Sequence, residues 1–130
     1  MLFYELFRNE PSLVELKAGA CLFREGEKAR QCMYVLIEGE VHILVGNMLV
    51  ERSRAGAIVG EMALIEHEAR SATIVAASDS RLVEIDRERF LALVARAPFF
   101  AVEVMRTMAA RLRHTNELLR EQELATAGCA

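Results

Sequence analysis

The chain has 130 residues, a length that suits one domain built around a single hydrophobic core. The formal net charge is −3, whereas nucleic-acid-binding domains usually carry an excess of basic residues. We therefore expect no direct DNA binding. No apolar run is long enough to cross a bilayer and no signal peptide is recognisable, so we expect no membrane partner. Cys21, Cys32 and Cys129 are too widely spaced for a CxxC motif or a disulfide framework, which favours a cytoplasmic location.

The first predicted elements are a short helix and a series of strands. Apolar residues at positions 2, 3, 6 and 7 predict an amphipathic helix within residues 1–10, which Pro11 should end. From Val14 onward, short β-rich runs are separated by glycines, and Gly46 and Asn47 form a two-residue hairpin turn between two of them. This pattern is typical of hairpins packed as a barrel or jelly roll. The expected strands cover residues 14–16, 21–23, 33–37, 41–45, 48–52, 72–76 and 81–85.

The segment 60–73 has the composition of a site for a small cyclic phosphate. Gly60 can adopt backbone conformations closed to other residues, so the chain can approach a ligand closely. The apolar turn 62–65 would direct free backbone N–H groups at an anion, and we expect its Met62 and Ile65 side chains to be buried. Arg70 supplies a planar fork that matches phosphate oxygens in pairs. Glu61 can only accept hydrogen bonds, so it requires a hydroxyl donor such as a ribose 2′-hydroxyl.

This segment resembles the phosphate-binding cassette of the cyclic nucleotide-binding domain family, which includes catabolite activator protein and the regulatory subunits of cyclic AMP-dependent kinase. The likeness extends from about Val14 to about Glu121, and Ala69 departs from the proline that many members have. It implies an α+β, mainly β fold: a double-stranded β-helix (jelly-roll) barrel over residues 12–86, with a short N-terminal helix, a cassette helix and a long C-terminal helix.

The resemblance also assigns roles within the cassette. It implies that Ser71 reaches an exocyclic phosphate oxygen, and that Ala63 and Leu64 lend backbone N–H groups and an apolar wall. The residues expected at the nucleotide are Gly60, Glu61, Met62, Ala63, Leu64, Arg70, Ser71, Ala72 and Thr73.

Two helices are expected after the barrel, within residues 87–125. Asp86 is a suitable N-cap for the first, and Pro98 separates it from a long final helix that starts near Phe99. Apolar residues of the final helix step by three and four, which predicts a short coiled coil. We expect its first half to pack on the barrel and its second half to form a homodimer, which the resemblance also implies. The seam residues are Met105, Met108, Leu112, Thr115, Leu119 and Gln122.

The resemblance places Thr115 and Asn116 at the amino group of an adenine, partly across the dimer. Thr115 is also a polar residue on an apolar seam, so its alternative role is to set the register of the helix pair. Ser71 and Thr73 offer hydroxyls that could serve a guanine amino group, which leaves cyclic GMP as an alternative ligand. The bacterial character of the cassette favours cyclic AMP.

The sequence therefore predicts a stand-alone sensor domain, without a DNA-binding domain, that binds a cyclic nucleotide and relays binding through its C-terminal helix to an unidentified effector protein. No paired carboxylates or nucleophile–base pair accompany the cassette, so we expect neither enzyme activity nor a cofactor. Glu66, His67 and Glu68 have a spacing that rarely closes a metal site, so no metal is expected. Two alternatives are a degenerate interaction module without nucleotide and a regulatory fragment of a larger protein.

Overall fold

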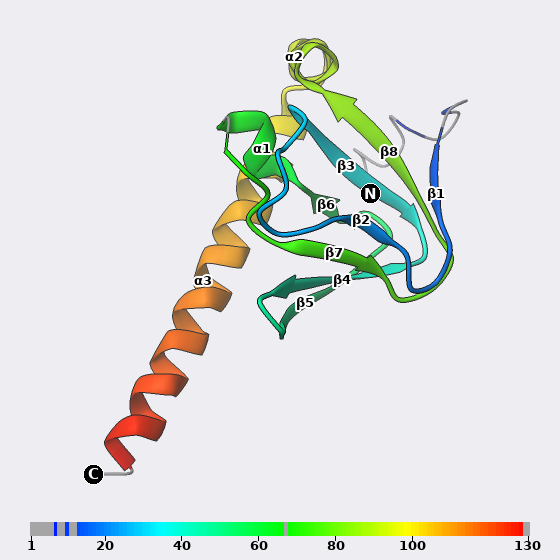
Figure 1. Ribbon diagram of the computed structural model, residues 1–130. Coiled ribbons are helices and arrows are strands. Elements are labelled where there is room, and N and C mark those ends of the chain that lie inside the picture. The colour runs from blue at the N-terminus through cyan, green and yellow to red at the C-terminus, as the bar shows by residue number, and fades with distance from the viewer. Residues whose placement is uncertain (1–6, 8–9, 11–12, 67, 129–130) are drawn as a thin grey trace.

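The protein folds into two antiparallel four-stranded sheets that face each other, with helices beside them (Figure 1). The computed structural model describes residues 7, 10, 13–66 and 68–128, with side chains as far as residue 124. The first sheet has the strand order β1-β8-β3-β6, and the second has the order β2-β7-β4-β5. The strands are β1 (Val14–Leu16), β2 (Cys21–Phe23), β3 (Cys32–Glu38), β4 (Glu40–Val45), β5 (Met48–Arg54), β6 (Ile58–Val59), β7 (Thr73–Ala76) and β8 (Ser80–Asp86). The helices are α1 (Glu61–Ile65), α2 (Arg87–Arg96) and α3 (Phe99–Gly128).

Strand β3 is buried on both faces, which explains its nearly continuous apolar sequence. Alternate residues of a strand point to opposite faces of the sheet. Met33 and Val35 lie in a first core that includes Phe100 of α3, whereas Leu36 lies in a second core between the two sheets. A strand covered on both sides has no solvent-facing positions to fill with polar residues. Strand β3 is therefore the common wall of both cores.

Helix α2 begins at the cap that the sequence indicates. The Asp86 carboxylate accepts a hydrogen bond from the backbone N–H of Arg89 at 2.8 Å, which satisfies one of the free N–H groups of the first turn. Helix α3 packs its first turns on the first sheet through the buried side chains of Phe100 and Val104. Its later turns extend beyond the sheets (Figure 1), since its 30 residues span about 45 Å at 1.5 Å per residue.

The mainly β jelly-roll architecture, with a cassette helix and a long C-terminal helix, is confirmed. The helix expected within residues 1–10 lies outside the described residues, apart from Phe7 and Glu10. Strand β6 was not predicted, because two residues are too few to show an alternating pattern. Helix α3 continues to Gly128, past the expected end at residue 125, because alanine favours a helix. None of the described helices is long and apolar enough to cross a membrane.

Phe100 connects helix α3 to the first core. Its side chain is fully buried and lies edge-on to the ring of Phe7, with 6.0 Å between the ring centroids. Phe100→Ala should lower the free energy of unfolding by about 3–5 kcal/mol, because it removes buried apolar surface and leaves a cavity. Chemical denaturation measures this loss. Leu91 of α2 is exposed, so Leu91→Ala is the matched control and should cost less than about 0.5 kcal/mol. Equal losses would contradict the assigned core.

A charged pair ties residue 10 to helix α2. Arg89 Nη1 and Nη2 donate hydrogen bonds to Glu10 Oε1 and Oε2 at 2.9 and 2.7 Å. The hydrogen bonding from Arg89 lowers the pKa of Glu10 below its ordinary value, against a smaller raising effect of burial. A carboxylate whose pKa is lowered by folding stabilises the folded state when ionised and loses this contribution when protonated.

Glu10→Gln should therefore reduce stability at neutral pH and have little effect in acid. The pKa of Glu10 is lower in the folded than in the unfolded state, so its contribution is complete above the unfolded-state pKa. The contribution is lost as the pH falls through the folded-state pKa. Thermal unfolding of both proteins as a function of pH should show the wild-type advantage shrinking towards zero in acid. An advantage that is independent of pH would mean that the pair stabilises the fold through packing alone.

Candidate functional site

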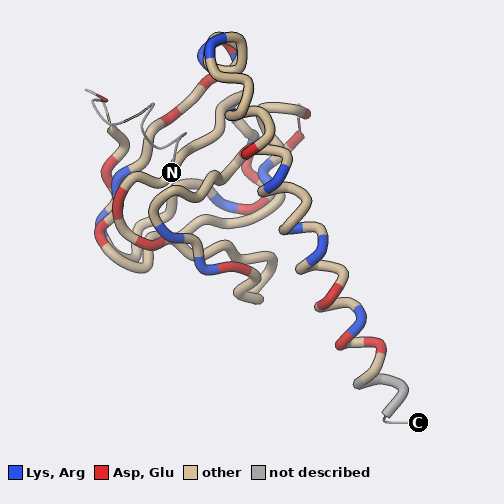
Figure 2. Tube along the Cα trace, turned by 180° about the vertical axis from the view of Figure 1, so that it is seen from behind, with Lys and Arg blue, Asp and Glu red and all other residues tan. Residues whose placement is uncertain are grey.

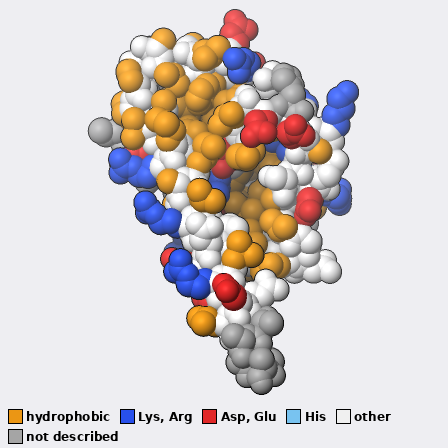
Figure 3. All heavy atoms as spheres, turned by 90° about the vertical axis from the view of Figure 1, so that its left-hand side faces the viewer, with side chains coloured by type: hydrophobic (Ala, Val, Ile, Leu, Met, Phe, Trp, Pro, Cys, Tyr) orange, Lys and Arg blue, Asp and Glu red, His pale blue; other side chains and the backbone are white. Residues whose placement is uncertain are grey.

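A cavity of about 760 Å³ lies between the second sheet, helix α1 and the middle of helix α3. The second sheet contributes apolar side chains, among them Ile43, Val50 and Ile74. Figure 3 shows the cavity as a hollow bordered by hydrophobic side chains, with charged groups inside it. Its volume falls within the range of about 300–1,000 Å³ that small-molecule sites occupy. The cavity is therefore large enough to enclose an organic ligand.

Gly60 makes the backbone turn at which helix α1 begins. It has φ 75° and ψ 14°, a left-handed conformation that residues with a Cβ rarely adopt. A Cβ at this position would also lie only 2.9 Å from Arg70 Nη1 and 3.3 Å from the ring of Phe23. Glycine is thus required here both for the backbone conformation and for the close approach of the Arg70 side chain.

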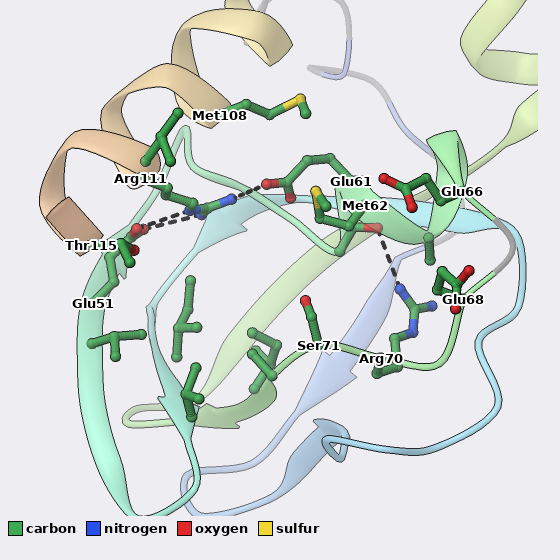
Figure 4. A pocket seen from close by; sticks show the side chains of 18 of the residues that line it. Glu51, Glu61, Met62, Glu66, Glu68, Arg70, Ser71, Met108, Arg111 and Thr115 are labelled. Atoms are coloured by element: carbon green, nitrogen blue, oxygen red, sulfur yellow. Dashed lines mark hydrogen bonds and ion pairs between the residues drawn. The ribbon is translucent and has the colours of Figure 1, made fainter. Parts of the chain in front are cut away.

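The guanidinium of Arg70 is buried at one end of the cavity, and only 6% of this residue is exposed (Figure 4). Nη1 donates to the backbone oxygens of Cys32 and Gly60, and Nη2 donates to that of Arg30, all at 3.3 Å. The guanidinium carbon lies 4.0 Å from the ring centroid of Phe23. Among the described residues, no carboxylate forms an ion pair with this guanidinium. Because a buried charge without a counter-ion is costly, this end of the cavity favours an anionic ligand.

The other end of the cavity holds a charge network that joins helix α3 to the barrel (Figure 4). Arg111 Nη1 donates to Glu61 Oε1 at 2.6 Å, while Nε and Nη2 donate to Glu51 Oε1 and Oε2 at 2.9 and 3.1 Å. Nη2 also donates to the backbone oxygen of Ile58 at 2.6 Å. Burial alone would lower the pKa of Arg111, but the two carboxylates raise it. Arg111 is therefore held as a cation by groups from β5, β6 and α1.

An irregularity in the β4–β5 hairpin turns Glu51 towards the cavity. Counted from the turn, Leu44 pairs with Leu49, and a regular hairpin would then pair Ile43 with Val50. The register shifts at this point, so Ile43 pairs with Glu51 instead and Val50 is an extra residue on β5. Ile43 is buried in the second core, so the position opposite it faces inward. The shift thus places a carboxylate on the inner face of the sheet.

Most of the cassette residues predicted from the sequence line the cavity, together with Thr115 of helix α3. Leu64 instead lies in the first core, and the Thr73 hydroxyl accepts a hydrogen bond from the backbone N–H of Glu25 at 2.9 Å. Asn116 is exposed and is not part of the cavity wall within this single chain. The predicted residues that line the cavity are Gly60, Glu61, Met62, Ala63, Arg70, Ser71, Ala72 and Thr115.

The expected burial of Met62 and Ile65 is wrong. These side chains are 43% and 51% exposed, whereas Glu61 and Leu64 are buried. Residues three apart share one face of a helix, so α1 can bury either the pair 61 and 64 or the pair 62 and 65. The hydrogen bond from Arg111 to Glu61 and the core contacts of Leu64 favour the first choice.

The charged pair Glu51 and Arg111 was not predicted from the sequence, and neither were Glu66 and Glu68, which also line the cavity. Arg111 donates to Glu61 within the protein, so Glu61 has a donor without a ligand, and its contact with a ribose hydroxyl stays a prediction. The sequence does contain a signal for Arg111, which follows Met108 by three residues and so lies on the same face of the helix. It contains no comparable signal for Glu51, since the shifted register becomes evident only in the paired strands.

The polar groups of the cavity are arranged to bind an anionic ligand that carries hydroxyl groups. Arg70 can receive an anion at one end of the cavity, and Glu61 can accept hydrogen bonds from hydroxyl groups farther along it. In the part of the chain that the structure describes, no group of three or more His, Cys, Asp or Glu residues could hold a metal ion.

Comparison with known proteins agrees with this geometry. The family model of the cyclic nucleotide-binding domain matches residues 13–97. The Cyclic AMP receptor protein of Thermus thermophilus is 33% identical over 105 residues, which cover 75% of this chain and 47% of that protein. The solved structure of cAMP-bound PfPKA-R has a TM-score of 0.71 and 26% identity, covering 82% of this chain and 36% of that chain. A structure from a study of a cyclic-GMP-dependent signalling pathway in bacterial phytopathogenesis has a TM-score of 0.68 and 30% identity, covering 85% of this chain and 89% of that chain.

The matched residues contain the whole cassette, 60–73, and all of the strands described above. This chain covers less than half of the Thermus thermophilus receptor and of PfPKA-R, so both of those proteins are considerably longer. The matching domain is a regulatory nucleotide-binding module rather than a catalytic one. The family match, the jelly-roll fold and the cassette agree, and the chain belongs to the cyclic nucleotide-binding domain family.

Proposed function

We propose that this domain binds a cyclic nucleotide, cyclic AMP in preference to cyclic GMP, and acts as a regulatory sensor without catalytic activity. Arg70 carries the proposal, because its guanidinium is buried at the cavity wall without a carboxylate partner among the described residues. A cyclic phosphodiester is an anion with a pair of exocyclic oxygens, which the fork of a guanidinium matches. Ser71 lies beside Arg70 at the cavity and adds a hydroxyl donor for the same phosphate (Figure 4).

The remainder of the ligand extends from Arg70 towards helix α3. With the phosphate at Arg70, the ribose 2′-hydroxyl donates to Glu61, and the purine lies near Thr115. We propose that Thr115, and Asn116 of a second copy, contact the adenine amino group. The preference for cyclic AMP is supported by the likeness to the Cyclic AMP receptor protein and to cAMP-bound PfPKA-R. The likeness to a protein of a cyclic-GMP-dependent pathway makes cyclic GMP the competitor to test.

Arg111 offers a route by which ligand binding could reach helix α3. A ligand shifts a conformational equilibrium only when it binds one state better than the other. Because Arg111 is part of α3 and donates to Glu61, a ligand at Glu61 touches the group that docks the helix on the barrel. We propose that the position of α3 carries the signal to an effector protein. Cys21 and Cys32 are free thiols, which fits the proposed cytoplasmic location.

We propose that the outer half of α3 forms a homodimer. Leu112 and Leu119 are 63% and 59% exposed, and residues seven apart lie on one face of a helix. This half extends beyond the sheets in Figure 1, and Figure 2 shows charges of both signs interspersed along it. Met108 and Thr115, which belong to the predicted seam, also line the cavity. A second copy on this seam would therefore stand beside the nucleotide.

Isothermal titration calorimetry with cyclic AMP and cyclic GMP tests the proposed ligand. Arg70→Ala should abolish binding, because it removes the only buried cation that the described residues place at this end of the cavity. Arg70→Lys keeps the charge but loses the fork, and should weaken binding about tenfold to a hundredfold, since a hydrogen bond to a charged group contributes about 1.5–3 kcal/mol.

Arg89→Lys is the matched control for this experiment. Arg89 also makes a bidentate contact with cation–π geometry, but its partners are Glu10 and Phe7, away from the cavity. Its replacement should leave nucleotide affinity unchanged. No heat with either nucleotide, from protein shown to be folded and free of bound ligand, would overturn the proposal and favour the degenerate interaction module.

The proposed dimer is tested by multi-angle light scattering during gel filtration. Leu119→Glu should convert the dimer to a monomer, because it places like charges on the apolar seam of both helices. Leu91→Glu changes a similarly exposed leucine on α2 and should leave the dimer intact. A wild-type chain that is monomeric at every concentration tested would rule out the dimer.

A further inference from the structure

Arg111 is oriented by one carboxylate and donates to another. Its Nε and Nη2 atoms face the two oxygens of Glu51, at 2.9 and 3.1 Å, in a side-on bidentate contact. Its remaining nitrogen, Nη1, donates to Glu61 Oε1 at 2.6 Å. A guanidinium is planar and rigid, so a contact that fixes one edge also fixes the direction of the N–H groups on the other edge. The orientation of Nη1 towards Glu61 therefore depends on Glu51.

Glu61 has little freedom once Arg111 is fixed. Its side chain is only 6% exposed, and the hydrogen bond from Arg111 uses one of its two oxygens. A carboxylate has about four lone-pair positions that can accept hydrogen bonds, so Glu61 can still accept hydrogen bonds from a ligand. In the proposed binding mode these positions receive the ribose 2′-hydroxyl. The strength of that hydrogen bond depends on how well the carboxylate is held in place before the ligand arrives.

We infer that Glu51 is a positioning residue for sugar recognition, acting through Arg111 to hold Glu61 in the orientation that accepts the 2′-hydroxyl. This inference rests on the proposed function, and it adds a residue outside the cassette to the machinery that reads the ribose. It also makes sugar recognition depend on the docking of helix α3, since Arg111 belongs to that helix. A nucleotide that lacks the 2′-hydroxyl should bind without engaging this network.

The surroundings of Glu51 fit such a role. Burial alone would raise its pKa, but hydrogen bonds from Arg111 and from the Ser53 hydroxyl outweigh burial and hold the pKa below its ordinary value. The carboxylate therefore stays ionised at neutral pH and can hold the guanidinium. The register shift at Val50 brings Glu51 to the inner face, where the side chain of Arg111 can reach it. The position, the charge and the hydrogen bonds of Glu51 thus all indicate Arg111 as its partner.

The test compares the affinities of cyclic AMP and 2′-deoxy cyclic AMP, measured by calorimetry on the full chain. Wild-type protein should bind cyclic AMP about tenfold or more tightly than the deoxy compound, as expected for a hydrogen bond to a charged group. Glu51→Gln keeps the length of the side chain but replaces one accepting oxygen with a donor that faces Arg111. It should lower this ratio about threefold or more, mainly by weakening the binding of cyclic AMP.

A second variant and a control separate positioning from loss of stability. Arg111→Lys keeps a positive charge without the planar fork, so it should lower the ratio as Glu51→Gln does. The double variant should then show no further loss, because both changes break one chain of contacts. Glu10→Gln removes another bidentate carboxylate–arginine contact, away from the cavity, and should leave the ratio unchanged. Circular dichroism confirms that each variant is folded.

The possible failures can be told apart. If Glu51→Gln weakens both nucleotides by the same factor, Glu51 is a structural residue and the inference is overturned, while the proposed function stands. If wild-type protein binds both nucleotides equally, Glu61 does not read the sugar and the inference is likewise overturned. Absence of binding to either nucleotide would overturn the proposed function, and the inference with it.

Discussion

The structure around the cavity depends on the position of the buried guanidinium of Arg70. The Arg70 side chain stacks on Phe23 and passes close to Gly60, whose positive φ already favours glycine. The backbone of Arg70 is fixed as well, since its N–H donates to the Glu27 oxygen at 2.9 Å and its oxygen accepts from the Gly26 N–H at 2.8 Å. The loop after β2, the start of α1 and the end of the cassette are thus assembled around one guanidinium. Its Nη atoms donate to neutral carbonyl oxygens and, among the described residues, to no carboxylate, so the charge is solvated by dipoles without a counter-ion.

Helix α3 connects three environments in a single rigid element. Phe100 lies in the first core, Arg111 lies at the cavity, and Leu119 is exposed in the outer half. A continuous helix transmits a small displacement at its middle to its free end, because its backbone hydrogen bonds resist bending. In the proposed relay, the core contacts at Phe100 would be the fixed point of such a movement. A change in the contacts of Arg111 would therefore be felt most strongly in the part of the helix farthest from the barrel.

The sequence is a good guide to this molecule where the information is local. Alternation of apolar residues, glycines at turns and the Asp86 cap locate most strands and both later helices within a few residues. Most of the residues that the cassette motif assigns to the nucleotide likewise line the cavity. Prediction fails where long-range contacts decide. Met62 and Ile65 stay exposed because Glu61 is drawn inward by a residue 50 positions away, and β6 exists only through its pairing with β3. Neither effect leaves a pattern in the neighbouring sequence.

The extra residue in the β4–β5 hairpin means that strand pairing decides the sign of charge on that wall of the cavity. The same sequence paired without the irregularity would place Glu51 opposite His42 and Arg52 opposite Val41, which lies in the second core. An arginine, and not a glutamate, would then take the inward position. The charge that this wall of the cavity presents to a ligand therefore depends on whether strand β5 accommodates one additional residue.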